Sequence, residues 1–393
     1  MAYIENQTVH DADSHVMELP EQILEYLESG YQAEFSEFAA AKLSTPDHLQ
    51  AAVDQQDSPA FRADEERELM LRKNHLALGA FRKEDRPRCL DLLGFSSQLV
   101  FTTVALGNFG LEDAGKPALA LAAARAHNRM NVDFCSVDKR LLATGYVPLL
   151  DIEAAPHIAQ EALQLGCKAL MIPSKCPPQH SPSHIGLEPL WSLAEEAGVP
   201  IVFHVGGEEK MADSYFENGL PRVKDFHGGE ENFTGLSFMS IPIAIWQSMA
   251  AIIFDGVLDR HPRLKFGAIE LGAAWLPSWL QFMDSAWGAF RKGEERLQKL
   301  SDRPSEIARR QFRVTPYAHE PTGWIMENSS EDMLLFSSDF PHVEGGRNPI
   351  KRFADNMPDV SDQAQRKFYR DNFIDMMGAG LDASLYDHPS VAA

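Results

Sequence analysis

Basic residues are scarce in this chain of 393 residues, in which 36 lysines and arginines stand against 57 aspartates and glutamates. The formal net charge of −21 excludes the basic face that nucleic acid or an anionic membrane surface would require, so we expect neither partner. An acidic substrate would have to be held by local cations or a metal ion against this field. The simplest interpretation of the acidity is that it keeps the protein soluble.

Cysteine is also sparse, and its spacing is not that of a disulfide framework. The four cysteines form no CxxC pair, so we expect reduced thiols at Cys89, Cys135, Cys167 and Cys176. The N-terminus has no basic segment followed by an apolar one, and no stretch reaches the roughly 18 apolar residues of a membrane span. We therefore expect a cytoplasmic protein.

Short apolar runs that alternate with helical patterns are abundant, and apolar residues make up 44% of the chain. Eight runs are typical of strands: 8–14, 98–103, 143–149, 168–173, 199–204, 264–270, 311–316 and 333–338. Helical patterns lie between them, at 118–134, 156–165, 187–196, 241–259, 273–289 and 361–376. Strands that alternate with helices predict an α/β fold with a parallel sheet, and eight such units predict a (β/α)8 TIM barrel.

Two segments exceed what a minimal barrel of about 250 residues requires. Residues of about 16–97, after the first strand, contain helix-like pieces and predict a helical insertion. Residues 205–238, after the fifth strand, are rich in glycine, charge and phenylalanine and predict a long loop. Both leave strand ends on the face where barrels build their active sites. We predict a single barrel domain over 1–377 and a C-terminal tail over 378–393.

Metal-ligand side chains stand at the ends of several of these runs, which is how a barrel assembles an active site. Asp11, Asp13 and His15 are two residues apart, so in a strand they point to one side. His204 ends the fifth run, and Asp339 follows the eighth, where a carboxylate is costly to bury without a cation. The alternatives are an exposed polar strand at the first motif and a core histidine at His204.

Four of these side chains, Asp13, His15, His204 and Asp339, offer two nitrogens and two carboxylate oxygens. This set favours one divalent ion, Zn²⁺ first and Mn²⁺ as the harder alternative. Such an ion would polarise a carbonyl or carboxylate, or lower the pKa of a water molecule. The order of the ligands and their strand-end positions carry this prediction, since no single motif is decisive.

Residues 11–18, 190–204 and 337–342 resemble the amidohydrolase superfamily. The branch is the one that contains aminocarboxymuconate-semialdehyde decarboxylase and the resorcylate and carboxyvanillate decarboxylases. The resemblance covers about residues 9–375 and implies a barrel enzyme with a small-molecule substrate and a homodimeric assembly.

By position, the resemblance implies that Asp13 and His15 are the ligands of the first strand and His204 that of the fifth. Asp339 would be the carboxylate of the eighth strand, which touches the metal and moves protons. Asp11 would orient the ligands of the first strand without itself binding the metal. His342 would either orient Asp339 or line the pocket.

Glu270 departs from the family pattern, because many members of the branch carry histidine near the end of the sixth strand. A carboxylate there could be a further ligand, a proton shuttle or an anchor for a substrate hydroxyl. It would repel the carboxylate of an incoming acid unless it is protonated or paired.

Other candidates carry weaker signals. Arg222 and Arg347 could bind a substrate carboxylate as a bidentate fork, although exposed surface positions are the favoured interpretation. His180 and His184 could reach the pocket, although simple loop positions are favoured.

We expect a metal-dependent carbon–carbon lyase, a non-oxidative decarboxylase of a small aromatic or unsaturated carboxylic acid. Asp339, Glu270 and His342 are the expected catalytic residues, with Asp339 delivering a proton to carbon as carbon dioxide leaves. The alternative is a hydrolase of a lactone, ester or amide, in which Asp339 activates water at the metal. The pairing of Asp13 with His15 is similar to that of aromatic-acid decarboxylases and favours this reaction, and Glu270 weighs against it. A remote alternative is a barrel that binds a metal or metabolite without catalysis.

Overall fold

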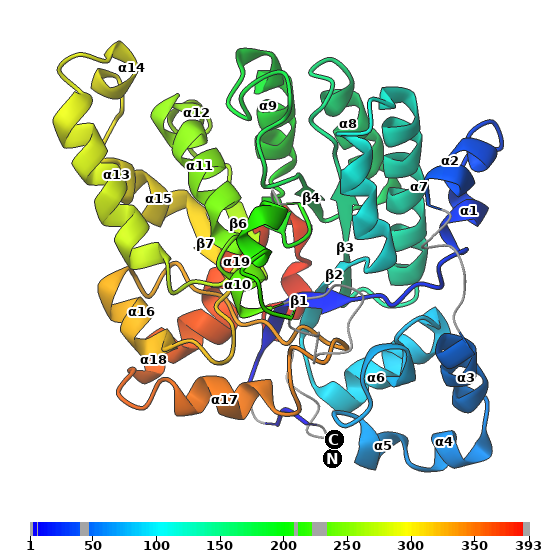
Figure 1. The fold of residues 1–393 in the computed structure, drawn as a ribbon. Helices are drawn as coiled ribbons and strands as arrows, with labels where there is room; N and C mark the ends of the chain where they lie inside the picture. The colour runs from blue at the N-terminus through cyan, green and yellow to red at the C-terminus, as the bar shows by residue number, and fades with distance from the viewer. Residues whose placement is uncertain (1–2, 6, 40–46, 208–210, 222–233, 388–393) are drawn as a thin grey trace.

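The sheet of this protein curls around a central axis, with helices along its outer side (Figure 1). The computed structural model describes residues 3–5, 7–39, 47–207, 211–221 and 234–387. Within these residues, seven parallel strands pair in sequence order. They are β1 (His10–His15), β2 (Ser97–Phe101), β3 (Leu141–Tyr146), β4 (Ala169–Met171), β5 (Ile201–His204), β6 (Phe266–Ile269) and β7 (Phe312–Val314). The predicted α/β barrel class is confirmed, and each strand falls on one of the first seven predicted runs.

The predicted eighth strand is not a regular strand, although it lies between β7 and β1. The N–H of Leu335 donates to the carbonyl of Val314 (3.0 Å), and the N–H of Asp339 donates to the carbonyl of Asp13 (3.0 Å). The N–H of Phe336 donates instead to a carbonyl in the C-terminal helical region. Because this amide is diverted, a continuous ladder does not form, and isolated bridges remain on each side. The segment still joins the two edges of the sheet.

The helices that follow the strands have these bounds: α7 (Pro117–Cys135), α8 (Ala154–Leu165), α9 (Glu188–Ala197), α11 (Ile241–Phe254), α13 (Leu276–Phe290), α14 (Glu295–Gln298), α15 (Pro304–Gln311), α16 (Thr322–Asn328) and α17 (Pro349–Asp355). The predicted helix 241–259 breaks at Gly256, whose φ of 75° is left-handed, and resumes as α12 (Val257–Arg260). The predicted helix 361–376 contains α18 (Asp362–Arg366), one π-helical turn and α19 (Asn372–Met377).

Short helices occupy the segment between β1 and β2: α1 (Ile23–Tyr26), α2 (Gln32–Phe38), α3 (Asp47–Gln56), α4 (Pro59–Ala63), α5 (Glu65–Glu68) and α6 (Arg86–Leu93). Four of them, α3 to α6, gather beside the sheet in Figure 1. The segment after β5 carries α10 (Gly235–Phe238), and residues 208–210 and 222–233 of this segment lie outside the described residues.

One helical stretch, Gly235–Phe254, is long and apolar enough to cross a membrane by length and composition alone. The prediction that no segment reaches this length is therefore wrong for this stretch. A core helix passes the same test, and α11 has this character because Ile245, Met249, Ile252 and Ile253 are buried in the main hydrophobic core. The stretch is weak evidence for a membrane span.

The four cysteines are free, as expected from their spacing. Three of them, Cys89, Cys135 and Cys167, are buried among apolar side chains, and Cys176 is exposed. In the predicted C-terminal tail, Leu381 is buried against the barrel.

Candidate metal centre

Side chains from three strands converge at the carboxyl ends of β1, β5 and β6. Asp13, His15, His204 and Glu270 each offer one ligand atom, and these atoms lie within 4.8 Å of one another. Nε2 of His204 lies 3.4 Å from Asp13 Oδ1 and 3.4 Å from Glu270 Oε2. Nε2 of His15 lies 3.4 Å from Asp13 Oδ1. The parallel sheet thus brings together residues that are up to 257 positions apart in the sequence (270 − 13).

Both imidazoles present a nitrogen lone pair to this cluster. Nδ1 of His15 lies 3.0 Å from the carbonyl of Thr102, and Nδ1 of His204 lies 3.0 Å from the carbonyl of Val205. A carbonyl can only accept, so each Nδ1 carries the hydrogen, and in the neutral form of each ring Nε2 is left without one. Nε2 of His15 is buried and makes no hydrogen bond within the described residues. A backbone carbonyl behind each histidine is the usual support of a metal-binding imidazole.

The electrostatics of the cluster also favour a cation. Burial, together with the nearby His342, lowers the pKa of His15 to about 4, so this ring is neutral at pH 7. Burial alone would raise the pKa of Asp13, but the two imidazoles beside its carboxylate, His15 and His204, hold it below its usual value. An ionised Asp13 beside the neutral His15 leaves a buried negative charge, which is costly without a counter-ion. The donor set fits one divalent metal ion.

Asp339 lies at the edge of this cluster, in a second group with His15 and His342. Its Oδ1 is 3.7 Å from Nε2 of His15 and 2.9 Å from Nδ1 of His342. Three of the four predicted ligands therefore share one cluster, in which Glu270 is the fourth member, and Asp339 reaches it through His15. The ligand and catalytic roles stay predictions.

The backbone turns sharply at Glu270 and at Asp339. Glu270 has a φ of 55° and Asp339 a φ of 51°, in the left-handed region that residues other than glycine rarely adopt. Glu270 is held from both sides, because its N–H donates to Thr315 Oγ1 (2.8 Å) and its carbonyl accepts from the Tyr317 hydroxyl (2.7 Å). Such strain is of order 1–3 kcal/mol per residue and clusters at functional sites.

Asp11 lies behind the cluster and is not a member of it among the residues described. Its carboxylate accepts hydrogen bonds from the Ser338 N–H (2.8 Å), the Ser338 hydroxyl (2.6 Å) and the Gln98 amide (2.8 Å). These bonds tie β1, which carries Asp13, to the segment that carries Asp339. The orienting role expected for Asp11 has this geometry in its favour and stays a prediction.

Thr103 and Glu18 are not among the site residues predicted from the sequence, yet both support the site. The Thr103 hydroxyl lies 3.1 Å from Nε2 of His342. Glu18 accepts hydrogen bonds from the N–H groups of Thr103 (2.9 Å) and Ala105 (2.6 Å). The sequence gives one indication of Thr103: this residue lies at the carboxyl end of the second predicted strand, as the other site residues lie at the ends of their strands.

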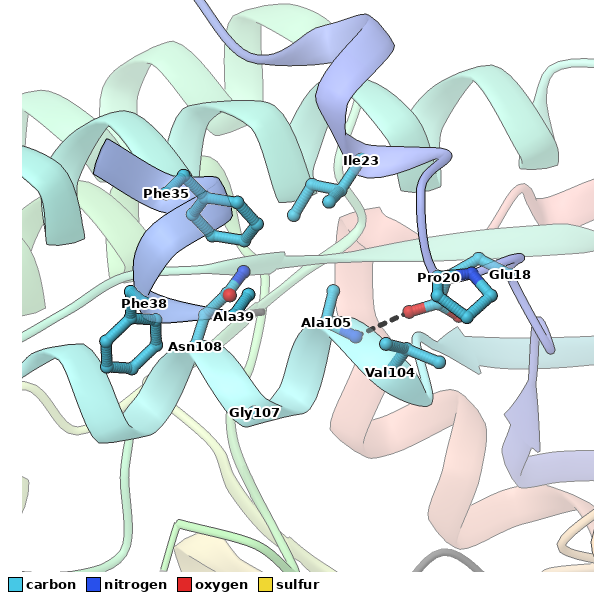
Figure 2. Close-up of a pocket in the computed structure, with 10 residues that line it drawn as sticks. All are labelled: Glu18, Pro20, Ile23, Phe35, Phe38, Ala39, Val104, Ala105, Gly107 and Asn108. Carbon is cyan, nitrogen blue, oxygen red and sulfur yellow. Dashed lines mark hydrogen bonds between the residues drawn. The ribbon is translucent and has the colours of Figure 1, made fainter. Parts of the chain in front are cut away.

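A small apolar pocket lies between the insertion and the segment after β2. Figure 2 shows Phe35, Ile23 and Ala105 around it, with Glu18 hydrogen-bonded to Ala105 at one end. No member of the ligand cluster lines this pocket, so it is separate from the candidate metal centre.

The weaker candidates do not join the cluster within the described part of the chain. His180 is engaged by two backbone carbonyls, those of Leu149 (2.8 Å) and Ser181 (2.9 Å). His184 and Arg347 are exposed. Arg222 lies outside the described residues.

Comparisons with known proteins identify a family and similar folds. The sequence model of the family described as Amidohydrolase matches residues 79–376. A search of curated proteins found no match. An amidohydrolase from Mycobacterium avium subsp. paratuberculosis K-10 has a similar structure, with a TM-score of 0.69 at 21% identity over 95% of this chain and 100% of that chain.

Two decarboxylases also have similar structures. The 5-carboxyvanillate decarboxylase from Sphingomonas paucimobilis gives a TM-score of 0.60 at 16% identity, over 95% of this chain and 99% of that one. The 5-carboxyvanillate decarboxylase from Novosphingobium aromaticivorans, complexed with manganese and 4-hydroxy-3-methoxy-5-nitrobenzoic acid, gives 0.62 at 17% identity, over 96% and 98%. At these identities the likeness shows the fold. The family match covers most of the chain, which therefore belongs to the amidohydrolase family.

Proposed function

We propose that this protein is a metal-dependent decarboxylase of a small aromatic or unsaturated carboxylic acid. The observation that carries the proposal is the buried cluster of Asp13, His15, His204 and Glu270 at the carboxyl ends of three strands. The decarboxylase reaction, in preference to other chemistry of the family, is supported by the aromatic acids that the structurally similar decarboxylases bind.

The residues that would hold the ion are Asp13, His15 and His204, with Glu270 or Asp339 completing the set. When bound, the ion supplies positive charge that polarises a carboxylate or carbonyl oxygen of the substrate. The side chains fix where that oxygen sits, because both histidines are held by backbone carbonyls and cannot rotate without losing a hydrogen bond.

Asp339 and His342 form the proton-handling part of the site. Their side chains are joined by a contact of 2.9 Å, so the pair can hold a proton between carboxylate and imidazole. In decarboxylation the substrate carbon takes this proton from Asp339, the bond from that carbon to the carboxylate breaks, and carbon dioxide leaves. The electron pair of the broken bond stays with the substrate carbon, which the proton neutralises, and solvent returns a proton to the pair.

Hydrolysis of a lactone, ester or amide is the second candidate function, and Glu270 favours it. This carboxylate lies 3.4 Å from His204 and would repel an acid at the same centre. A neutral carbonyl substrate would meet no such repulsion, and Asp339 would then act as the base that takes a proton from water.

Incubation with a panel of aromatic acids in deuterated water distinguishes the two. A decarboxylase releases carbon dioxide and places one deuteron on the carbon that carried the carboxylate, whereas turnover of esters or lactones without carbon dioxide supports the hydrolase. Replacing Asp339 by Asn should abolish either reaction and leave the fold intact. The matched control is Asp355→Asn, which changes an exposed carboxylate paired with Lys351.

Stoichiometric metal without turnover over a broad substrate panel would instead favour the barrel that binds without catalysis. The preference for Zn²⁺ over Mn²⁺, the homodimeric assembly and the cytoplasmic location belong to this proposal. Elemental analysis, sedimentation and cell fractionation test these three points.

A further inference from the structure

Glu270 is a member of the ligand cluster whose backbone conformation needs support from outside its own strand. Its φ of 55° lies in the left-handed region, which is costly for a residue with a Cβ. Its carboxylate also shares the cluster with that of Asp13, and two carboxylates at this separation repel each other. Without restraint, both effects would turn Glu270 away from the other ligand atoms.

The segment after β7 supplies this restraint through two side chains that contact the backbone of Glu270 directly. The N–H of Glu270 donates to Thr315 Oγ1 (2.8 Å), and the carbonyl of Glu270 accepts from the Tyr317 hydroxyl (2.7 Å). Each of the two peptide groups that flank the Cα of Glu270 is therefore fixed by one hydrogen bond. A rotation about φ or ψ would break at least one of these bonds.

A third side chain of this segment, Glu320, joins it to the turn after β6. Its buried carboxylate accepts hydrogen bonds from the N–H groups of Ala273 (2.9 Å), Ala274 (2.9 Å) and Tyr317 (2.7 Å). Gly272 makes this close approach possible, because a Cβ there would lie 2.9 Å from Cε2 of Tyr317 and 3.1 Å from Oε1 of Glu320. The turn after β6 and the segment after β7 are thus held together as one unit.

The ring of Tyr317 is itself confined, which limits where its hydroxyl can point. Its centroid lies 5.3 Å from that of Phe238 in α10, and it stacks on His319 with the centroids 5.6 Å apart. The segment after β5, which carries Phe238, therefore contributes to the position of the hydroxyl.

We infer that Tyr317 is a positioning residue, whose hydroxyl keeps the carboxylate of Glu270 turned toward the other ligand atoms of the metal centre. Thr315 and Glu320 act in the same direction. The inference rests on the metal centre of the proposed function and deepens it, because it assigns control of one ligand to the segment after β7. Loss of the restraint lowers metal affinity, since part of the binding free energy is then used to bring Glu270 back into the cluster.

The test removes the hydroxyl of Tyr317 and leaves its ring. Calorimetric titration of the metal-free proteins with Zn²⁺ and with Mn²⁺ should show an affinity about 2- to 10-fold lower in Tyr317→Phe than in the wild type, as expected for loss of a neutral hydrogen bond. Tyr26→Phe is the matched control, because its hydroxyl donates to Asp133 (2.8 Å) and joins α1 to α7 instead. This control should leave the metal affinity unchanged.

A double-mutant cycle with Glu270→Ala separates positioning from a general loss of structure. In the Glu270→Ala background, Tyr317→Phe should have no further effect on metal affinity, because no ligand side chain is left at that position. A structural defect would lower the affinity in both backgrounds. Thr315 gives a conservative rescue: Thr315→Ser keeps the acceptor for the N–H of Glu270 and should bind metal as the wild type does, whereas Thr315→Val should bind it more weakly.

The outcomes distinguish this inference from the proposed function. Equal metal affinity in Tyr317→Phe and the wild type would overturn the positioning role. So would an equal loss of affinity from Tyr317→Phe with and without the Glu270 side chain. Both results leave the proposed function standing, because the wild type still binds the ion. Failure of the wild type to bind either ion would overturn the metal centre, and with it both the proposed function and the role of Tyr317.

Discussion

The hydroxyl of Thr103 lies 3.1 Å from Nε2 of His342 and 2.9 Å from the carbonyl of Val16. A hydroxyl has one hydrogen, and the Val16 carbonyl can only accept it, so Nε2 of His342 must be the donor to Thr103. The opposite nitrogen of the same ring, Nδ1, faces Asp339 at 2.9 Å. Thr103 thus fixes which way His342 presents its ring to Asp339.

Replacing Thr103 by Val should therefore lower kcat with little effect on KM, because the ring of His342 loses its acceptor while the ligand cluster is unchanged. Loss of one hydrogen bond to a positioned ring is worth about 1–2 kcal/mol, or roughly 5- to 30-fold in rate. Thr103→Ser keeps the hydroxyl and should restore most of the rate. Steady-state kinetics on an accepted acid checks this, and equal rates in the Val and Ser variants would contradict it.

Glu270 and Asp339 should differ in what they contribute to metal binding. Glu270 shares the cluster with Asp13 and His204, whereas Asp339 contacts it at 3.7 Å through His15. Glu270→Gln should therefore weaken metal affinity more than Asp339→Asn does, and Asp339→Asn should mainly lower turnover. Titration of the metal-free proteins with Zn²⁺ and with Mn²⁺ measures the affinities. The opposite order would make Asp339 the fourth ligand.

Removal of the metal should lower the melting temperature. An ion that binds only the folded chain stabilises it by about 2.7 kcal/mol when the free ion concentration is a hundred times its Kd. His204→Ala should abolish this dependence, because it removes one of the two nitrogens from the cluster. The exposed His184 offers a control, and His184→Ala should keep the full response to chelation. A chelator that leaves the wild-type melting temperature unchanged would argue against a bound ion.

Much of this site could be predicted because parallel strands of a barrel end on one face. Asp13, His15 and His204 required only the recognition that an apolar run ends in a ligand. Thr103 could not be found in this way, because its importance lies in a contact between segments far apart in the sequence. Thr103 matters through one hydroxyl contact with His342, and no local pattern encodes that contact.

The eighth strand shows where the sequence pattern stops being sufficient. An apolar run predicts an extended, buried segment, which 333–338 is, but the pattern does not reveal which acceptor each amide will find. The N–H of Ser338 donates to the side-chain carboxylate of Asp11 rather than to a backbone carbonyl of a neighbouring strand. The same limit applies to Glu270 and Asp339, because each of these residues has a left-handed backbone conformation that the sequence pattern does not indicate.

Close packing of β3 against the outer helices makes Gly145 sensitive to substitution. A Cβ at this position would lie 2.9 Å from Cβ of Ala162 and 2.9 Å from Sγ of Cys167. Gly145→Ala should cost about 1–3 kcal/mol of stability, as overpacking in a core does. Gly288 in α13 is the control, because a Cβ there would meet no atom within 4 Å, and Gly288→Ala should be neutral or stabilising. Urea unfolding of both variants measures the difference.

A pH-dependent part of the stability should arise at Glu112, far from the ligand cluster in sequence. Its carboxyl group accepts hydrogen bonds from the Tyr146 hydroxyl and from the N–H of Leu149, but burial dominates and raises its pKa from 4.5 to about 7. The folded protein therefore holds a proton that the unfolded chain releases near pH 4.5. The stability associated with the neutral form is complete below about pH 4.5 and is lost as the pH rises through about 7.

Glu112→Gln removes this titration, so its stability relative to the wild type should rise between about pH 5 and pH 8. The rise should be up to about 3 kcal/mol, the free energy that corresponds to the shift in pKa. The amide also changes the hydrogen bonds to Tyr146 and Leu149, but that effect is the same at every pH and shifts the whole curve. Urea unfolding of both proteins across this range, with metal in excess, isolates the slope. A constant difference would show that Glu112 is ionised in the folded protein throughout, with its two donors compensating for its burial.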